Sequence, residues 1–295
     1  MTTALPRDII DKLTALDPAI GPELVEGSWK LLTPLHEKLG YTAPRVDRDL
    51  SYGPDARHRL DIHSNPDQPN APVFLFAHGG GFVQGDKHVE GTPMYDHVGA
   101  WAARHGWVGV TITYRLAPGH TWPSGADDVA AAVAWARTHI ADYGGDPDRI
   151  VVAGHSAGAV HVASYVAGHG SGGDGGGSFD GVRGAVLLSG IYDPMAHGQG
   201  EHPYFGRLPN ERVSTVPGLL DTRIPLLFSI AERDPDIFHA QAAAVVSAWL
   251  ARHGTVPNLA YVPGHNHISE IASLGVDDEA LGVALARFID RHAAG

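Results

Sequence analysis

The sequence predicts an α/β protein built on a mostly parallel, doubly wound sheet, and two observations lead to that prediction. The chain has 295 residues, of which 43% are hydrophobic and 18% charged, a composition typical of a globular protein with a large core. From residue 72 onward, short and continuously apolar runs alternate with amphipathic stretches. Continuous apolar runs are expected of strands that helices bury on both faces.

The first 45 residues are expected to form a helical segment ahead of the sheet. Apolar residues recur at helical spacing on either side of Pro18 and Pro22, which predicts a pair of short amphipathic helices within residues 7–40. We therefore divide the chain into an N-terminal helical cap segment, residues 1–45, and an α/β domain, residues 46–295. Packing of the helices at a sheet edge is the alternative to a cap.

The α/β domain is expected to open with a hairpin, because residues 46–51 and 58–63 alternate in polarity around a Gly53-Pro54-Asp55 turn. Buried strands are then predicted at residues 73–77, 108–113, 150–153, 185–188, 225–230 and 259–262. Helices are predicted near residues 94–105, 124–142, 157–168, 237–253 and 277–292. The alternation of strand and helix predicts parallel strands with helices on both faces.

Charge and composition exclude several classes of function. With 33 acidic and 21 basic side chains the formal charge is −12, so no nucleic-acid partner is expected. The absence of cysteine excludes disulfides, thiolate metal ligands and a cysteine nucleophile. No apolar run is long enough for a signal peptide or a membrane span, which predicts a cytoplasmic protein without membrane association. The oligomeric state is left open, a homodimer included.

A glycine-rich stretch at residues 168–181 is interpreted as a flexible surface loop. It matches the spacing of a dinucleotide-binding fingerprint at Gly168, Gly170 and Gly173. That fingerprint requires a strand before its first glycine, whereas a helix is expected here. Asp174 and Asp180 lack the further oxygen ligands that calcium requires. The sequence therefore predicts no cofactor and no metal.

The sharpest local signal is a pentapeptide between a predicted strand and a predicted helix, Gly154-His155-Ser156-Ala157-Gly158. A serine at a sharp strand-to-helix turn is presented at the sheet edge, and the flanking glycines let strand and helix approach closely. The helix N-terminus then points free N–H groups toward any anion that forms at the serine. Ser156 is therefore the candidate nucleophile.

A second glycine motif, His78-Gly79-Gly80-Gly81-Phe82, ends the first buried strand. Successive glycines leave backbone N–H groups exposed, as an oxyanion hole requires. The N–H groups of Gly80 and Gly81, together with that of Ala157, would supply three donors. A flexible glycine turn is the alternative, and the presence of Ser156 favours the functional interpretation.

A serine nucleophile needs a base, and the base needs a carboxylate that orients it. The loop after the strand at 225–230 offers carboxylates, in order of preference Asp234, Asp236 and Glu232. The loop after the strand at 259–262 offers His267, which we prefer to His265. The His265-x-His267 spacing also suits two metal ligands, but the sequence offers no third ligand. The predicted triad is Ser156, His267 and Asp234.

Six motifs in order give the chain, from about residue 46 to its end, a resemblance to a known family. They are His78-Gly79-Gly80-Gly81, Tyr114-Arg115-Leu116-Ala117-Pro118, Gly144-Gly145-Asp146-Pro147, Gly154-His155-Ser156-Ala157-Gly158, Asp234-Pro235 and Gly264-His265-Asn266-His267. With them the chain resembles α/β-hydrolases of the hormone-sensitive-lipase-like or bacterial carboxylesterase group. The resemblance implies the α/β-hydrolase fold, the triad and oxyanion hole named above, and hydrolysis of carboxylic esters with small to medium acyl or aryl groups, without a cofactor.

Two departures from that group keep other functions open. His155 stands where the group usually has aspartate, and residues 231–235 and 192–216 resemble the arylformamidase and feruloyl-esterase-like branch. The alternatives are therefore an arylformamidase or amidase acting on N-formyl or activated aryl amides, and a non-catalytic hydrolase fold that binds a ligand.

Further residues are assigned from their place in the predicted fold. His155 is expected to point away from the nucleophile as a packed or hydrogen-bonded side chain, and Asp128 to be an acidic residue in the first turn of a helix. An acyl or alcohol pocket for a small-molecule ester is predicted to be lined by Trp29, Phe82, Tyr192, Met195, Tyr204 and Phe205.

Overall fold

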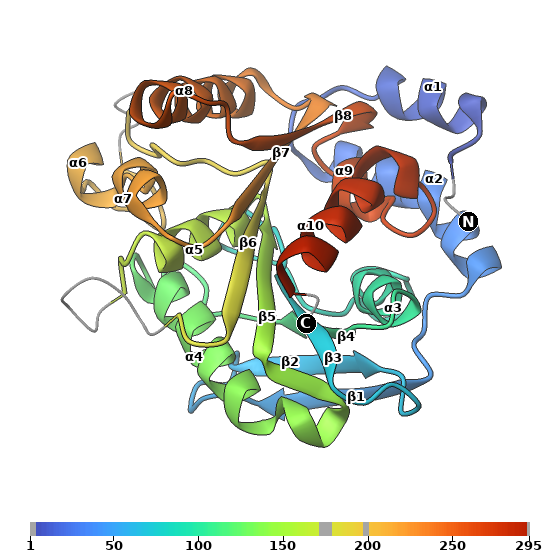
Figure 1. Cartoon of the computed structure of the whole chain (residues 1–295). Coiled ribbons are helices and arrows are strands. Elements are labelled where there is room, and N and C mark those ends of the chain that lie inside the picture. Colours follow the sequence, from blue (N-terminus) through green and yellow to red (C-terminus); the bar gives the residue numbers. More distant parts are fainter. Residues whose placement is uncertain (1–3, 171–178, 197–200, 294–295) are drawn as a thin grey trace.

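An eight-stranded sheet runs through the centre of the molecule in the order β1-β2-β4-β3-β5-β6-β7-β8 (Figure 1). The structure, a computed structural model, describes residues 4–170, 179–196 and 201–293. The strands are β1 (Arg45–Ser51), β2 (Arg59–Ser64), β3 (Ala71–Ala77), β4 (Val108–Ile112), β5 (Gly145–His155), β6 (Val182–Leu188), β7 (Leu226–Arg233) and β8 (Asn258–Asn266). Each of the eight predicted strands is present, and the predicted α/β class is confirmed.

Strand directions follow the predicted division between an opening hairpin and a parallel sheet. β1 pairs with β2 in antiparallel register, and β2 is antiparallel to β4. From β4 through β3, β5, β6 and β7 to β8, every neighbouring pair is parallel. The carboxyl ends of the parallel strands therefore meet at one edge, which is where loops can combine residues distant in sequence.

Both faces of the sheet are buried, as the continuous apolar runs predicted. In β3, Val73 and Leu75 join one apolar cluster with α4 (Ser124–His139) and α5 (Ala157–Val166). Phe74 and Phe76 join the other cluster, with α3 (Asp96–Arg104) and α10 (Val283–Ala293). Figure 1 shows these helix pairs on opposite sides of the sheet. The alternation follows from the strand pleat, which turns successive side chains to opposite faces.

The five predicted helices of the α/β domain are α3, α4, α5, α8 (Asp236–His253) and α10. A π-helical turn at Asp278–Gly282 precedes α10. The helix predicted near residues 124–142 ends in a 3-10 turn at Ile140–Tyr143. Three short elements were not predicted: α6 (Asn210–Val213), α7 (Val216–Asp221) and α9 (Ser269–Ala272). These elements are four to six residues long, too short to show a helical period in the sequence.

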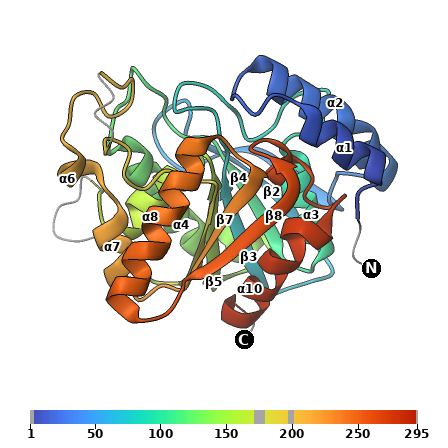
Figure 2. The same ribbon diagram turned by 90° about the horizontal axis from the view of Figure 1, so that it is seen from above.

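The predicted pair of N-terminal helices is present as α1 (Arg7–Ala15) and α2 (Pro22–Leu39). Leu13 and Leu32 are fully buried and pack in one cluster with Met94 and Ala272. In Figure 2, α1 and α2 lie side by side, and α1 contacts β8 while α2 contacts α9. The N-terminal segment thus packs against the part of the chain that carries His267.

Asp128 is not the acidic residue of the first helical turn that the sequence suggested. It is buried within α4, accepts the backbone N–H of Arg115 at 2.7 Å, and lies 2.9 Å from His58 Nε2. Asp127 is the acidic residue in the first turn. Asp128 therefore ties the start of β2 to the segment after β4.

The glycine-rich stretch supplies no cofactor motif in the described part of the chain. Gly168 follows helix α5 rather than a strand, while Gly173 and Asp174 lie outside the described residues. Asp180 forms an ion pair with Arg137 at 3.4 Å. Among residues 4–170, 179–196 and 201–293, no group of three or more His, Asp or Glu side chains could hold a metal ion. Within the same ranges, no helix combines the length and apolar character that crossing a membrane would require.

Candidate active site

Ser156 occupies the sharp turn between β5 and α5. Its backbone has φ 55° and ψ −121°, a conformation that side-chain-bearing residues rarely adopt and that persists only where the surroundings enforce it. A Cβ on Gly154 would lie 2.3 Å from the backbone of Gly158, and a Cβ on Gly158 would lie 2.2 Å from the carbonyl oxygen of Ala77. Both glycines are therefore required for the close approach of helix and strand that presents Ser156.

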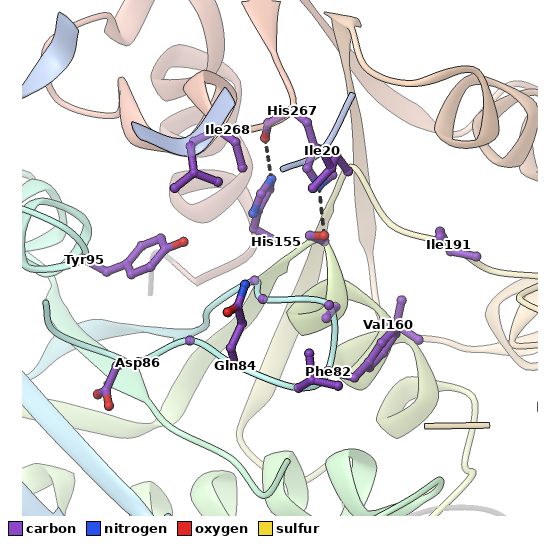
Figure 3. Close-up of a pocket in the computed structure, with 18 of the residues that line it drawn as sticks. Ile20, Phe82, Gln84, Asp86, Tyr95, His155, Val160, Ile191, His267 and Ile268 are labelled. Atoms are coloured by element: carbon purple, nitrogen blue, oxygen red, sulfur yellow. Dashed lines mark hydrogen bonds between the residues drawn. The ribbon is translucent and has the colours of Figure 1, made fainter. Parts of the chain in front are cut away.

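The three residues of the predicted triad are brought together at the carboxyl edge of the sheet. His267 Nε2 lies 2.9 Å from Ser156 Oγ, and His267 Nδ1 lies 2.6 Å from Asp234 Oδ1. Figure 3 labels His267 at the cavity, where dashed lines mark its hydrogen bonds. Because Nδ1 faces a carboxylate, the ring holds its proton there and leaves Nε2 free to accept the serine proton.

Asp234 is held in place on both of its oxygens. Oδ1 accepts from His267, while Oδ2 accepts the backbone N–H of Ala231 at 2.8 Å and the hydroxyl of Ser189 at 2.6 Å. Burial alone would raise the pKa of Asp234, but the hydrogen bonds from His267, Ser189 and Ala231 outweigh it and lower the pKa below its ordinary value. Asp234 is therefore a carboxylate at neutral pH, as the partner of a proton-accepting imidazole must be.

The alternative acids and the alternative base are placed elsewhere. Asp236 is exposed in the first turn of α8, and Glu232 is exposed and accepts the N–H of Gly264 at 2.7 Å. His265 is buried, with Nε2 3.1 Å from Asp277 and Nδ1 3.1 Å from Ser269 Oγ. The contacts of Glu232 and His265 hold the segment that carries His267. His267 is the histidine that meets Ser156, and Asp234 is the carboxylate that meets His267.

His155 is hydrogen-bonded, as expected, but its ring does not point away from the catalytic residues. Its Nε2 lies 2.8 Å from the carbonyl oxygen of His267, and the two rings are 4.7 Å apart (Figure 3). Burial lowers the pKa of His155 to about 3, so the ring is neutral and donates to that carbonyl. His155 therefore supports the position of His267 and is not a second base.

The glycine loop after β3 faces the same space as Ser156. Gly80 has φ +138° and Gly81 has φ +59°, and the carbonyl of Gly80 accepts the N–H groups of Val83 and Gln84 at 3.2 Å. Ala157 is the first residue of α5, where an N–H has no partner within the helix. Gly80, Gly81 and Ala157 line one cavity together with Ser156 and His267. This placement suits three donors for a developing oxyanion.

Substitution of Gly80 by alanine is expected to lower kcat by about 100- to 1,000-fold, the usual loss when one oxyanion donor is misplaced. A Cβ at Gly80 would lie 2.0 Å from the carbonyl oxygen of Gln84, so the loop must shift. Gly254→Ala is the matched control, since Gly254 has φ +72° at the end of α8 with open space around it. Equal kcat in the Gly80→Ala and Gly254→Ala proteins would contradict an oxyanion role for this loop.

The cavity in front of Ser156 has a volume of about 510 Å³ and is mainly apolar. Ile20, Val25 and Trp29 come from the N-terminal segment. The remaining apolar side chains come from loops and helices of the α/β domain: Phe82, Val83, Val89, Val160, Ile191, Phe238 and Ile268. Gln84, Asp86 and Tyr95 add polar groups on the side of the glycine loop (Figure 3). Such a space accepts an apolar group and few charges.

Two of the six predicted pocket residues, Trp29 and Phe82, line this cavity, and the prediction is wrong for the other four. Tyr192 is buried, with its ring edge-on to Phe228 at 5.5 Å. Tyr204 stacks on Phe82 at 4.7 Å, and Phe205 and Met195 belong to the same cluster. Tyr204, Phe205 and Met195 support Phe82 from behind, because they pack in its cluster instead of overhanging the site.

Sequence reasoning also missed two residues behind the triad. Ser189 and Glu270 are buried, and Ser189 joins the carboxylates of Asp234 and Glu270. The signal for Glu270 was present, because a single glutamate stands between Ile268 and Ile271, three residues after His267. A carboxylate in an apolar run near a catalytic histidine is a candidate for a buried, functional group.

Similarity to known proteins covers the glycine loop and the region around Ser156. The BD-FAE family model matches residues 60–174. The chain is 37% identical over 169 residues to the probable carboxylic ester hydrolase LipM of Mycobacterium tuberculosis, covering 52% of this chain and 38% of LipM. It is 30% identical over 248 residues to esterase LipQ of the same organism, covering 76% of this chain and 58% of LipQ. The chain thus spans less than two thirds of either relative.

A solved structure shares the fold over nearly the whole chain. EstE1, a thermophilic carboxylesterase cloned from a metagenomic library, aligns with a TM-score of 0.69 at 22% identity, covering 95% of this chain and 100% of EstE1. At this level of identity the agreement concerns the arrangement of strands and helices.

Proposed function

The chain belongs to the α/β-hydrolase superfamily, and we propose that it hydrolyses carboxylic esters through an acyl-enzyme on Ser156. The observation that carries this proposal is the relay from Asp234 Oδ1 to His267 at 2.6 Å and from His267 to Ser156 Oγ at 2.9 Å, facing the glycine loop. LipM and LipQ, whose names describe ester hydrolysis, support it.

Acylation begins when Ser156 Oγ attacks the ester carbonyl carbon and its proton passes to His267 Nε2. The carbonyl electron pair moves onto oxygen, and the N–H groups of Gly80, Gly81 and Ala157 stabilise the resulting anion. When the intermediate collapses, the bond from the acyl carbon to the alcohol oxygen breaks. His267 then donates its proton to the departing alcohol.

Deacylation repeats the sequence with water as the nucleophile. His267 removes a proton from water, the hydroxide oxygen bonds to the acyl carbon, and the proton returns to Ser156 Oγ as the acid leaves. Asp234 keeps the imidazole in the required tautomer and stabilises the imidazolium in both halves. The chemistry needs no cofactor, because Ser156, His267, the ester and water account for every bond and every proton in both halves.

The size and lining of the cavity favour esters with small to medium acyl or aryl groups. Its volume of about 510 Å³ and its apolar walls suit an uncharged acyl chain or ring. Turnover of p-nitrophenyl acetate, p-nitrophenyl octanoate and N-formylkynurenine tests this substrate class. We expect kcat/KM to be highest for an ester. A higher value for N-formylkynurenine would favour the arylformamidase alternative, and failure to hydrolyse any of the three would favour a non-catalytic protein.

We also infer that residues 1–45 act as a cap that shapes the substrate pocket. Ile20, Val25 and Trp29 of this segment line the cavity beside Ser156. Trp29→Ala is expected to raise KM about tenfold for p-nitrophenyl octanoate and much less for the acetate, because only the longer chain reaches the lost aromatic surface.

Trp249→Ala is the matched control for Trp29→Ala, since Trp249 packs on Phe228 at 6.2 Å and does not line the cavity. This protein should keep the wild-type ratio of KM values. Equal changes in KM for acetate and octanoate after Trp29→Ala would refute the cap.

A further inference from the structure

A second buried carboxyl group, Glu270, lies behind the triad, and the mechanism above does not use it. Glu270 belongs to the short helix α9, three residues after His267, and its side chain is fully buried. Oε1 is hydrogen-bonded to the hydroxyl of Ser229 on β7, and Oε2 lies 2.6 Å from Ser189 Oγ. Glu270 therefore shares a hydrogen-bond network with the catalytic acid.

Ser189 is the link between the two carboxyl groups. Its Oγ lies 2.6 Å from Asp234 Oδ2 and 2.6 Å from Glu270 Oε2. A serine hydroxyl has one proton to donate, so it can satisfy only one carboxylate. If both carboxyl groups were ionised, one of these short contacts would join two oxygens with no hydrogen between them. Both contacts are hydrogen bonds only when one carboxyl group carries a proton.

The hydrogen-bond partners decide which carboxyl group carries that proton. Asp234 already accepts from His267 Nδ1 and from the N–H of Ala231, so three donors converge on it once Ser189 is included. Glu270 has only the hydroxyl of Ser229 besides Ser189. A carboxylate with several donors holds its charge, whereas a buried carboxyl group with few donors stays neutral. The proton therefore belongs on Glu270.

The charged and titratable groups around Glu270 support a neutral side chain. Asp234 is an anion, and His155, whose Nε2 lies 3.9 Å from Oε2, is neutral because burial lowers its pKa to about 3. The hydroxyl of Tyr192 is directed to the carbonyl of Leu187 and not to Glu270. His267 contacts Asp234, which separates it from Glu270. Within the described ranges, no lysine or arginine forms an ion pair with Glu270. Burial, and then the charge of Asp234, raise the pKa of Glu270 to about 8.

We propose that Glu270 is a positioning residue that carries a proton in the working enzyme and donates it to Ser189 Oγ, which commits the Ser189 hydroxyl to Asp234. The hydrogen bonds then run in one direction, from Ser229 to Glu270, to Ser189 and to Asp234. This series of hydrogen bonds fixes the plane of the Asp234 carboxylate toward His267. It also leaves Asp234 as the single negative charge beside His267. The proposed role of Glu270 rests on the proposed function only where it predicts changes in kcat or KM.

Variants at Glu270 and Ser189 separate a protonated from an ionised Glu270. Glu270→Gln can reproduce the protonated form, because its amide N–H donates to Ser189 while its oxygen accepts from Ser229. At pH 7, Glu270→Ala and Ser189→Ala are expected to lower kcat about 10- to 100-fold with KM nearly unchanged, since each leaves buried polar groups unpaired. Glu270→Gln is expected to restore most of the turnover lost in Glu270→Ala. Glu279→Gln, on an exposed side chain, is the matched control.

An ionised Glu270 predicts a different kinetic result for Glu270→Gln, and that result would overturn the proposal. If Glu270 acts as an anion, Glu270→Gln will lose as much kcat as Glu270→Ala. It will also shift the acidic limb of the kcat/KM profile to lower pH, because a negative charge near His267 has been removed. A protonated Glu270 predicts an acidic limb that Glu270→Gln leaves in place.

Two measurements test the protonation without any substrate. Infrared difference spectra between pH 6 and pH 10 should show the carbonyl band of a protonated carboxylic acid in the wild-type and Glu279→Gln proteins, and not in Glu270→Gln. Because the folded-state pKa of Glu270 is raised, the folded chain keeps a proton that the unfolded chain releases, and wild-type stability should fall from about pH 5 to pH 8 relative to Glu270→Gln. Denaturant midpoints at the two pH values measure this difference.

The two measurements without substrate also separate failure of the Glu270 proposal from failure of the proposed ester hydrolysis. Absence of the infrared band at pH 6, or a stability difference that does not change with pH, overturns the protonated Glu270 even in a fully active enzyme. A wild-type protein that shows both signals but hydrolyses no ester would instead contradict the proposed function.

Discussion

Replacement of Ser156 by alanine is expected to lower kcat for p-nitrophenyl acetate by about 10⁴-fold or more. The substitution removes the oxygen that forms the acyl-enzyme, while the Gly80 and Gly81 loop and His267 stay in place. What activity is left would come from water held near the oxyanion donors. Steady-state rates and the loss of a pre-steady-state burst of p-nitrophenol measure the effect.

Ser247→Ala is the control for Ser156→Ala, because Ser247 is exposed on α8, away from the cavity. It should leave kcat and KM unchanged. Circular dichroism of both proteins verifies that they are folded. A Ser156→Ala protein that hydrolyses the ester at the wild-type rate would eliminate covalent catalysis at this residue.

Replacement of Asp234 by asparagine is expected to lower kcat by about 10⁴-fold with little change in KM. The amide N–H of asparagine would donate to His267 Nδ1, which places the imidazole proton on Nε2. That nitrogen lies 2.9 Å from Ser156 Oγ and could then no longer accept the serine proton. The size of the side chain is preserved, so the loss reports the tautomer of His267 and not a cavity.

Asp236→Asn and Glu232→Gln are matched controls for Asp234→Asn, because they make the same chemical change on exposed carboxylates two residues to either side of it. Both should retain nearly wild-type kcat. A larger loss in either control than in Asp234→Asn would assign the catalytic acid to that residue and contradict the relay described above.

The strands of the sheet were predictable because their signal is local. Residues 73–77 and 150–153 are apolar throughout, and a run of this kind is stable only between two layers of helices. The short helices α6, α7 and α9 gave no such signal, since their positions depend on the surfaces against which they pack. The buried hydrogen bonds of Asp128 were not predicted either, because its partners Arg115 and His58 are brought to it by tertiary contacts.

The order of the motifs along the sequence was enough to nominate Ser156, Asp234 and His267. Each follows a predicted strand, and parallel strands place their carboxyl ends at one edge. The walls of the pocket could not be nominated in the same way. The predicted fold placed Tyr192 and Tyr204 near the site, yet Tyr192 is buried against Phe228 and Tyr204 supports Phe82.

The sequence by itself determined the strand and helix pattern and the chemical groups that meet at the sheet edge, because hydrophobic periodicity and turn residues act over a few positions. Only the tertiary structure decided which side chains face the cavity, and that Ser189 lies 2.6 Å from both Asp234 and Glu270. Those relations depend on packing between segments far apart in the chain. A difference of one ångström there decides whether two oxygens share a proton, and no local pattern encodes it.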